Sequence, residues 1–472
     1  MHFVLACVLA PALAWSAAVQ AQPAPAGPEV VSFAQAQAWL QAQSAQLAAE
    51  RKAVESAQLR REGMQGLGGP SVALTGMAYR YAIEAQVDTE PVRAALTHAA
   101  MLQPPEIAAA VGGLQLPGTY TLQRQDTQTS ASVSAVWPVY MGGLADAVRT
   151  GLDGSTLEAQ AQAQMSQDQV HSLLVQRYFG AQLAQRAAWL REQAVQGMRA
   201  HDDAAQRMLQ AGVIAQVERL QASAALADAQ QQAQKAHSDA QLATQALART
   251  LYLRQGVQPS SPLFVDSRPL PALHHFQEAA LQLHPGLQKV QAKRTQALAL
   301  HDASEALRKP QVLAFGLREV NTSGKPNWMA GMAVRWTLWD SVDRKKLAAA
   351  GERAVEQADL SAEQVRNDIA LLVEKNWLAV EQARVAYLSG QAQEALADAL
   401  LHLRHAGLQA GTSTALDLMD AQLNVAKVKT ERANAANQYV QALAALLESS
   451  GQSEAFGQYM ARADIYLSAD AP

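Results

Sequence analysis

The chain has 472 residues and a formal net charge of −4 at pH 7, and only 5 % of its residues are aromatic although 49 % are hydrophobic. Much of the apolar count is alanine, which accompanies abundant Gln, Glu and Leu. This composition argues against a conventional globular core and favours long helices packed along their lengths. The mild acidity and the absence of a phosphate-binding basic cluster exclude a nucleic-acid partner.

The first 21 residues are predicted to be a secretory signal peptide. An apolar run interrupted by Pro11 ends in Val19-Gln20-Ala21, a small-residue cleavage pattern before Gln22, although no Lys or Arg precedes the run. The single cysteine, Cys7, lies inside this segment, so the mature chain is expected to carry no thiol. No other stretch reaches the ~18 to 20 apolar residues of a spanning helix. If the mature protein crosses a membrane, it therefore does so with strands.

The remaining chain is predicted to contain two similar halves joined by a Pro/Ser-rich linker. The first half (22–253) comprises a helix over 33–65, a strand over 71–81, a loop over 82–117, a strand over 130–140 and a helical hairpin over 144–253. The linker is 254–272. The second half (273–450) comprises a helix over 273–309, strands over 311–320 and 328–338, a helical hairpin over 340–449, and then a tail over 451–472. Gly76 shifts the alternation of the first strand, which predicts a bulge there.

The two halves match without a gap over more than a hundred residues. Adding 199 carries Trp137 to Trp336, Tyr178 to Trp377, Gly212 to Gly411 and Glu218 to Asp417. Two unrelated alanine-rich helices would not keep aromatic residues, the turn and an acid in register, so the chain contains an internal repeat. Each half then has one helix of about 100 Å, at 1.5 Å per residue, and shorter helices of about half that length to pair with it.

The four strands have the length and the pattern of membrane-spanning strands. Each has about ten residues, alternates apolar with small or polar side chains, and carries aromatic residues near its ends, which is typical of a barrel with aromatic girdles. The expected girdle consists of Tyr79, Tyr81, Trp137, Tyr140, Trp328 and Trp336. An ordinary antiparallel sheet on a soluble core is the alternative. Four strands cannot close a barrel, but three copies would supply about twelve.

The helix–strand–strand–helix repeat resembles the TolC-type outer-membrane efflux proteins over essentially the whole mature chain. The motifs that carry the resemblance are the strand-to-helix junctions at Trp137-Pro-Val-Tyr140 and Trp336-Thr-Leu-Trp339, and the hairpin tip Ala410-Gly411-Thr412-Ser413-Thr414 leading to Asp417 and Asp420. The resemblance implies a homotrimer with a 12-stranded β-barrel in outer-membrane lipid and a helical tunnel through the periplasm. It also implies docking to a periplasmic adaptor protein and to an inner-membrane pump of the RND, ABC or MFS type, in tripartite efflux or type I secretion.

Candidate functional residues lie at the hairpin tips. Asp417 and Asp420 share a helix face just after the turn, where a trimer would arrange them as carboxylate rings that select cations, with Glu218 as the repeat counterpart of Asp417. The alternative is that they are first-turn acids favoured by the helix dipole. Gly212 and Gly411 are expected to cap the long helices. By resemblance, the tips at Gly212, Val213, Gly411 and Thr412 are expected to contact the adaptor. Ser413 and Leu408 stand where some family members carry an Arg and a Tyr that hold the closed state.

No catalytic or cofactor site is predicted. Asp398, His402 and His405 share a helical face, but such groups on long polar helices are usually solvated, so no metal is expected. Nucleophilic triads and nucleotide-binding motifs are missing, which argues against an enzyme. The leading hypothesis is a passive export channel gated at its periplasmic end, and the rival is a secreted structural or adhesive coiled-coil protein. The sequence does not indicate which substrate is exported.

Overall fold

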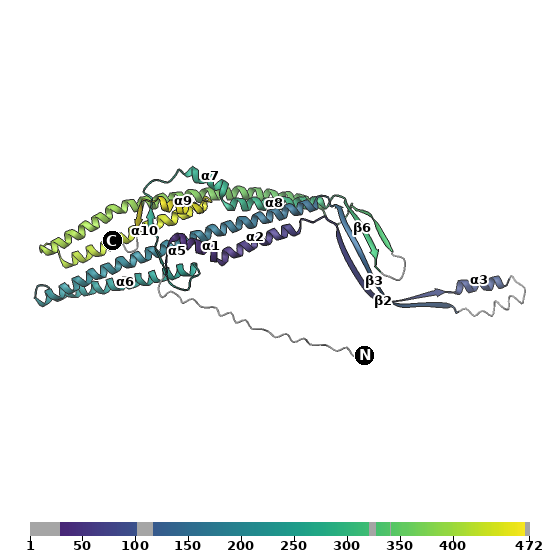
Figure 1. The fold of residues 1–472 in the computed structure, drawn as a ribbon, viewed down its shortest axis with the longest axis horizontal. Helices are drawn as coiled ribbons and strands as arrows, with labels where there is room; N and C mark the ends of the chain where they lie inside the picture. The colour runs from purple at the N-terminus through teal and green to yellow at the C-terminus, as the bar shows by residue number, and fades with distance from the viewer. Residues whose placement is uncertain (1–28, 102–116, 321–326, 340, 468–472) are drawn as a thin grey trace, which may run out of the picture. The chain divides into compact units, whose positions relative to one another are not determined.

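The computed structural model describes residues 29–101, 117–320, 327–339 and 341–467 (Figure 1). The predicted signal peptide lies outside these residues. The chain divides into two compact units: unit 1 contains the chain up to Glu55, Glu158–Val290 and the part from Ser361 onward, and unit 2 contains Ser56–Leu157 and Gln291–Leu360. The units cut across the two predicted repeats, because the long helices α5 (Leu144–Gln210) and α9 (Arg344–Gln409) contribute to both.

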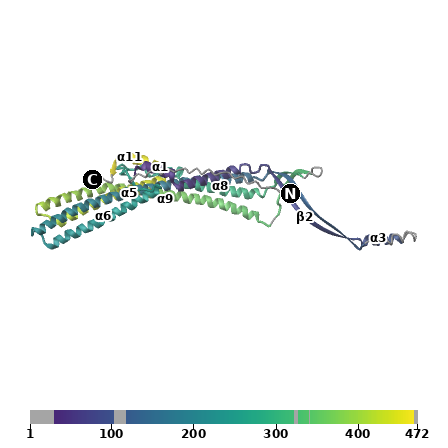
Figure 2. The same cartoon turned by 60° about the horizontal axis from the view of Figure 1, so that its bottom comes forward.

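Two helical hairpins make up most of unit 1. α5 turns back into α6 (Gln216–Thr250), and α9 turns back into α10 (Ala415–Ser449), with the helices of each pair side by side in Figures 1 and 2. α6 and α10 begin 199 residues apart and end 199 residues apart. The same pattern of apolar residues and turn signals has therefore produced the same local structure twice.

The shorter helices that precede the strands are each divided in two, where a single helix was predicted. They are α1 (Phe33–Gln43) with α2 (Ala45–Gly63), and α7 (Leu273–Leu283) with α8 (Pro285–Ala306). The breaks fall at Ser44 and His284, whose backbones are extended. His284 precedes a proline, which disfavours the helical conformation of the residue before it. At the other break the Ser44 hydroxyl accepts a hydrogen bond from Leu47 N–H at 3.3 Å. It therefore caps α2.

Small sheets in unit 1 involve the segments predicted to be a linker and a tail. β1 (Glu29–Val31) pairs in parallel with β4 (Val257–Pro259), and β5 (Leu263–Val265) pairs antiparallel with β8 (Ile465–Leu467). The tail also contains a 3₁₀ turn, η1 (Ser453–Ala455), and the short helix α11 (Phe456–Arg462). Both segments are therefore ordered parts of unit 1 rather than plain connections.

An aromatic core lies where these strands meet the long helices, although the composition argued against one. Phe33, Phe179, Phe264 and Phe456 are fully buried, with ring centroids 5.2 Å apart for Phe33 and Phe456 and 5.8 Å apart for Phe179 and Phe264. Few large side chains are needed, because they come from four separate stretches and are concentrated at one level of the helices. Pairs at these distances add stabilisation beyond the burial of their area.

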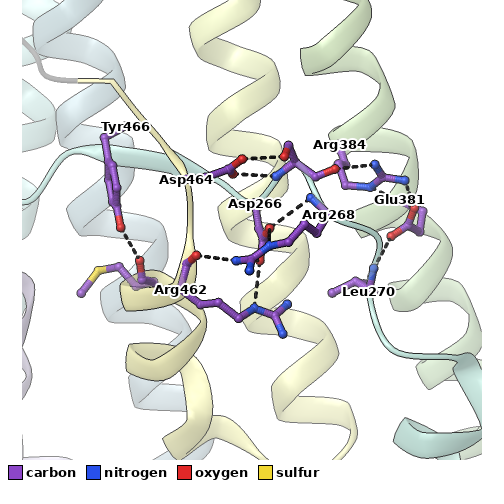
Figure 3. A network of polar contacts seen from close by, with 10 residues as sticks. Asp266, Arg268, Leu270, Glu381, Arg384, Arg462, Asp464 and Tyr466 are labelled. Atoms are coloured by element: carbon purple, nitrogen blue, oxygen red, sulfur yellow. Dashed lines mark hydrogen bonds and ion pairs between the residues drawn. The ribbon is translucent and has the colours of Figure 1, made fainter.

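A network of ion pairs fastens the C-terminal segment to the turn after β5 (Figure 3). The Asp266 side chain is only 2 % exposed and accepts hydrogen bonds from Arg268 Nε at 2.8 Å and from Arg462 Nε at 2.9 Å. Burial by itself raises the pKa of Asp266, but the hydrogen bonds from Arg268 and Arg462 outweigh it and hold the pKa below its usual value. Asp464 in turn accepts hydrogen bonds from the Ser267 backbone at 2.8 Å and hydroxyl at 2.5 Å.

Unit 2 contains one antiparallel sheet in the order β2-β3-β6-β7. Its strands are β2 (Ser71–Asp88), β3 (Thr119–Tyr140), β6 (Gln311–Glu319) and β7 (Trp328–Arg335). The predicted loop over 82–117 is wrong in part: β2 continues to Asp88, a helix α3 (Glu90–Ala100) follows, and 102–116 lie outside the described residues. The proline-rich composition of the segment favoured a loop. Ile83, Ala85 and Val87 nevertheless alternate with polar residues, with the period of two that is typical of a strand.

The predicted bulge at Gly76 is also wrong. β2 and β3 pair without interruption from Ser71–Val136 to Asp88–Thr119, and Gly76 lies directly opposite Ala131. The shift in the sequence pattern at Gly76 therefore changes which face of the sheet carries the apolar side chains, because the backbone register stays constant.

Candidate channel wall and helical tips

One face of the sheet in unit 2 is apolar across three of its four strands. Alternation along each strand and the cross-strand register place one set of side chains together, and we call it the tryptophan face. It consists of Val72, Leu74, Val133, Ala135, Trp137, Trp328, Ala330, Met332 and Val334. Leu74 is 73 % exposed and Trp328 is 72 % exposed. An exposed apolar face of this size marks contact with lipid or with another protein.

The opposite face, called the serine face here, carries small and polar side chains on β2 and β3. These are Ser71, Ala73, Thr75, Ser132 and Ser134, although Val136 of β3 also lies on this face. β6 is the exception, because the register puts Leu313, Phe315 and Leu317 on the serine face. Phe315 lies against Gly331 of β7, where an added Cβ would come within 3.3 Å of its ring. The glycine thus makes room for an aromatic ring, and the apolar side chains of this strand lie on the side opposite to the tryptophan face.

The residues predicted to form one aromatic girdle do not share a face. Trp137 and Trp328 lie on the tryptophan face, whereas Tyr79 and Tyr81 follow the parity of the serine face, with ring centroids 6.2 Å apart. Trp336 follows β7, and its indole N–H donates to the Arg308 carbonyl at 3.2 Å. Tyr140 lies beyond an irregularity in the β3–β6 register after Pro138.

The helical hairpins end in two turns of the same geometry. Gly212 and Gly411 have φ of +70° and +76°, the left-handed region that glycine adopts cheaply. Val213 N–H bonds to the Met208 carbonyl at 2.9 Å and Thr412 N–H to the Gly407 carbonyl at 2.8 Å, which is the Schellman pattern. The predicted capping role of both glycines is confirmed. Val213 is 71 % exposed and Thr412 is also exposed, so both tips are open to solvent in the described chain.

The candidate gate acids differ in their surroundings. Asp417 is the third residue of α10 and forms a capping box with Thr414: its carboxylate accepts from the Thr414 backbone N–H at 3.0 Å and its own N–H donates to the Thr414 hydroxyl at 3.1 Å. The hydrogen bonds from the Thr414 backbone and hydroxyl lower the pKa of Asp417 below its usual value, and Arg404 adds to this effect. Asp420 is exposed on the second turn of α10, and Glu218 is exposed on the first turn of α6. Local capping thus accounts for Asp417 and leaves Asp420 and Glu218 unexplained.

Two ion pairs that the sequence reasoning did not anticipate join the arms of the hairpins near their tips. Arg219 of α6 forms a two-pronged contact with Asp202 of α5, at 2.5 Å and 3.2 Å, and Arg404 of α9 lies 4.0 Å from Asp417. The positions equivalent to Asp202 and Arg219 in the second hairpin are Leu401 and Leu418. The sequence shows this difference directly, because Leu401 and Leu418 replace the acid and the base at these two positions.

The two hairpins also contact each other within unit 1. Met419 of α10 is buried beside Val195, Met198 and Ala222 of the first hairpin, and the His201 ring lies 3.1 Å from the Gln422 side-chain oxygen. Burial lowers the pKa of His201, and the nearby His405 lowers it further, while the hydrogen bond with Gln422 acts in the opposite direction. Met419, the neighbour of Asp420 in the sequence, therefore packs against the first hairpin, whereas Asp420 itself is exposed.

The described residues show no group of three His, Cys, Asp or Glu side chains arranged to hold a metal ion. Of the residues considered for such a site, Asp398 lies 3.4 Å from Lys429 on the neighbouring helix. A search of the same part of the chain for a helix long and apolar enough to cross a membrane finds none.

Comparisons with known proteins agree with this architecture. The sequence model of the family described as "outer membrane efflux protein" matches residues 277–452. Among curated protein sequences, none matches the chain significantly. The fold is similar to that of the outer-membrane channel OprN, with 17 % sequence identity, a TM-score of 0.69, and coverage of 89 % of this chain and 90 % of that one.

Two further solved channels have the same fold. The CmeC outer membrane channel of Campylobacter jejuni is 13 % identical, with 91 % of this chain and 88 % of that chain covered and a TM-score of 0.72. The MtrE outer membrane channel of Neisseria gonorrhoeae, solved in its open state, is 15 % identical, with 89 % of each chain covered and a TM-score of 0.71. Residues 277–452 thus match the outer membrane efflux protein family, and the described chain has the fold of these solved outer-membrane channels.

Proposed function

We propose that three copies of the chain form a passive exit duct, in which twelve strands close a barrel in the outer membrane and the helices line a tunnel. The observation that carries the proposal is the open four-stranded sheet, which has β2 and β7 as its edges and an exposed tryptophan face. An open sheet edge is not tolerated in lipid, because its backbone groups would have no partners there. Pairing the edges of three sheets removes them, and it puts the serine face toward a water-filled lumen.

Partners follow from the direction of transport. A duct without an energy source of its own depends on an inner-membrane pump, and the exposed tips at Gly212–Val213 and Gly411–Thr412 offer a docking surface for a periplasmic adaptor. The two tips share backbone geometry but differ in side chains, so an adaptor can bind both in a similar way. We place the protein in a tripartite efflux or type I secretion assembly.

Asp420 and Glu218 are the residues we propose for the periplasmic constriction, with Asp417 contributing charge from within its capping box. A ring of carboxylates at a narrow point holds multivalent cations and obstructs anions. Asp420 is preferred over Asp417, because the Asp417 carboxylate is already held by Thr414 and Arg404.

Conductance of the purified protein in planar bilayers tests the duct and the ring together. Asp420→Asn should weaken block by multivalent cations added on the periplasmic side, whereas Asp398→Asn, an exposed acid paired with Lys429 away from the turn, should leave the block unchanged. Absence of any conductance, with release of the protein from membranes by salt alone, would support a secreted coiled-coil protein instead. Equal block in Asp420→Asn and the parent would remove the carboxylate ring and leave the duct standing.

A further inference from the structure

The two long strands of unit 2 continue as a ribbon beyond the rest of the sheet. The last residue pair between β3 and β6 is Ser132–Glu319, but β2 and β3 go on pairing from Met77–Ser130 to Asp88–Thr119. At about 3.4 Å per residue this ribbon is roughly 40 Å long. Figures 1 and 2 show it leaving the sheet, with α3 at its far end.

The apolar side chains change face at the point where the ribbon leaves the sheet. Before Gly76 in the sequence, the apolar side chains are Val72 and Leu74, and they lie on the tryptophan face. After Gly76, the apolar side chains are Met77, Tyr79 and Ile83, and they lie on the continuation of the serine face. The uninterrupted register excludes a bulge that would turn them back. The tryptophan side of the ribbon becomes polar in exchange, with Arg80, Glu84 and Asp88.

This exchange of faces separates the ribbon from lipid. If the tryptophan face contacts lipid and the serine face lines the lumen, then Met77, Tyr79 and Tyr81 lie on the side of the channel axis. Strands in a ribbon twist progressively, so only the residues next to the sheet keep the orientation of its two faces. Met77, Tyr79 and Tyr81 are these residues. Met77 is 58 % exposed and Tyr79 is 46 % exposed within the single chain.

We propose that these side chains bind the same side chains of two further copies of the chain, so that three ribbons converge above the barrel and narrow its outer mouth. The proposal rests on the trimeric duct proposed above. A two-stranded ribbon is at best marginally stable alone in water, so a ribbon of this length needs permanent cover for its apolar face. Only symmetry-related copies are always present on the axis side.

The charges on the inward face suit contact between copies. Asp126 and Arg124 lie two residues apart on β3, opposite Tyr81 and Ile83, and both are exposed. In a ring, each contact joins one side of a ribbon to the other side of its neighbour. Arg124 of one copy can therefore meet Asp126 of the next. The face thus carries one base and one acid within reach of the aromatic residues.

Site-specific cross-linking in the full-length chain tests the proposal. Since Cys7 lies in the predicted signal peptide, single cysteines can be introduced without competing thiols. Tyr79→Cys points to the proposed axis, and Ala78→Cys, its neighbour on the other face, is the matched control. In outer membranes treated with a short thiol cross-linker, Tyr79→Cys should shift from monomer to covalent dimer, and Ala78→Cys should stay monomeric. The double variant Tyr79→Ala/Tyr81→Ala should raise single-channel conductance by roughly twofold, because it widens a constriction in series with the pore.

The oligomeric state of the detergent-purified parent separates the two proposals. A trimer in which Tyr79→Cys and Ala78→Cys cross-link equally overturns the convergent ribbons and leaves the duct intact. A trimer in which Tyr79→Cys instead reacts with a lipid-soluble thiol reagent also overturns them, because the side chain would then face lipid. A monomer overturns the duct first, and the ribbon proposal with it.

Discussion

At the scale of single residues, Tyr178 connects three stretches of the chain in unit 1. Its buried hydroxyl donates to the Val31 carbonyl at 2.7 Å and accepts from the backbone N–H groups of Ser260 and Ser261 at 3.0 Å and 2.7 Å. The repeat counterpart, Trp377, donates from its indole to the Pro271 carbonyl at 3.0 Å. In both halves an aromatic side chain on the long helix holds an extended segment that passes beside it.

We expect Tyr178→Phe to lower the free energy of unfolding by about 1–3 kcal/mol, because it leaves buried backbone groups without partners. Chemical unfolding of the detergent-solubilised protein, followed by circular dichroism, measures the loss. Tyr466→Phe is the control: that hydroxyl makes one bond, to the Met460 carbonyl at 3.1 Å, and the residue is 50 % exposed. An equal loss in the two variants would mean that the buried Tyr178 hydroxyl stabilises the fold no more than the exposed Tyr466 hydroxyl does.

Two titratable groups beside the aromatic core respond to pH in opposite directions. Burial raises the pKa of Asp168 to about 6, and the nearby carboxylates of Glu448 and Glu454 add to this, while the hydrogen bond from Gln164 opposes it. Burial lowers the pKa of His171 to about 4, with Phe33 and Phe456 against its ring. The folded state therefore binds a proton at Asp168 more readily, and at His171 less readily, than the unfolded chain does.

The sign of each contribution follows from this difference. Asp168 stabilises the fold below its ordinary pKa, and its contribution is lost as pH rises toward 6, so Asp168→Asn should gain stability over the parent as pH rises through this window. His171 destabilises the fold as pH falls from its ordinary value toward 4, so His171→Phe should lose less stability than the parent on acidification. Melting temperatures between pH 4 and pH 7 measure both effects. Parallel curves for parent and variants would contradict the burial of either group.

At the scale of elements, the two hairpins have ion pairs at different positions along their helices. In the second hairpin Arg432 of α10 binds Glu394 of α9 at 2.6 Å and lies 4.5 Å above the Tyr387 ring. The equivalent positions in the first hairpin are Val195 and Ala233, which are buried apolar residues. The first hairpin has its ion pair, Asp202–Arg219, where the second has leucines. Each hairpin thus has an ion pair at a position where the other has apolar residues.

Glu394→Gln should destabilise the protein by about 1–3 kcal/mol, because it leaves a largely buried arginine without its counter-charge. The double substitution Glu394→Val/Arg432→Ala reproduces the first hairpin and should recover most of the loss, since apolar replacement of such a pair is often neutral. Glu55→Gln, which breaks the exposed pair with Lys52, should change stability by less than about 1 kcal/mol. A double variant as unstable as Glu394→Gln would show that the charges themselves are required.

At the scale of the whole molecule, the proposed barrel assigns one face of the sheet to lipid and the other to the lumen. Leu74 and Ala73 are neighbours on β2 and lie on the tryptophan face and the serine face respectively. Leu74→Arg should reduce the amount of folded protein in outer membranes, because an arginine on the lipid side costs about 2–4 kcal/mol near the middle of the bilayer. Ala73→Arg should be tolerated and should shift ion selectivity toward anions. The reverse pattern would exchange the lipid and lumen faces.

The sequence by itself determined the repeat, the long hairpins and their turns. Local signals suffice there: helical periodicity, glycines at left-handed positions, and an offset of 199 residues that keeps Gly212 in register with Gly411. The sequence also placed Asp417 in the first turn of its helix. Its role as a cap follows from Thr414, three residues before it.

The tertiary structure decided which faces those elements present and what the irregular segments do. Whether Gly76 marks a bulge depends on the register with β3, and the side of β6 that bears Leu313 and Phe315 depends on pairing with strands far away in the sequence. The aromatic core and the small sheets of unit 1 unite residues separated by more than 200 positions. Such contacts leave no periodic trace in the chain, because each partner is specified by the shape and chemistry of a distant segment rather than by its neighbours.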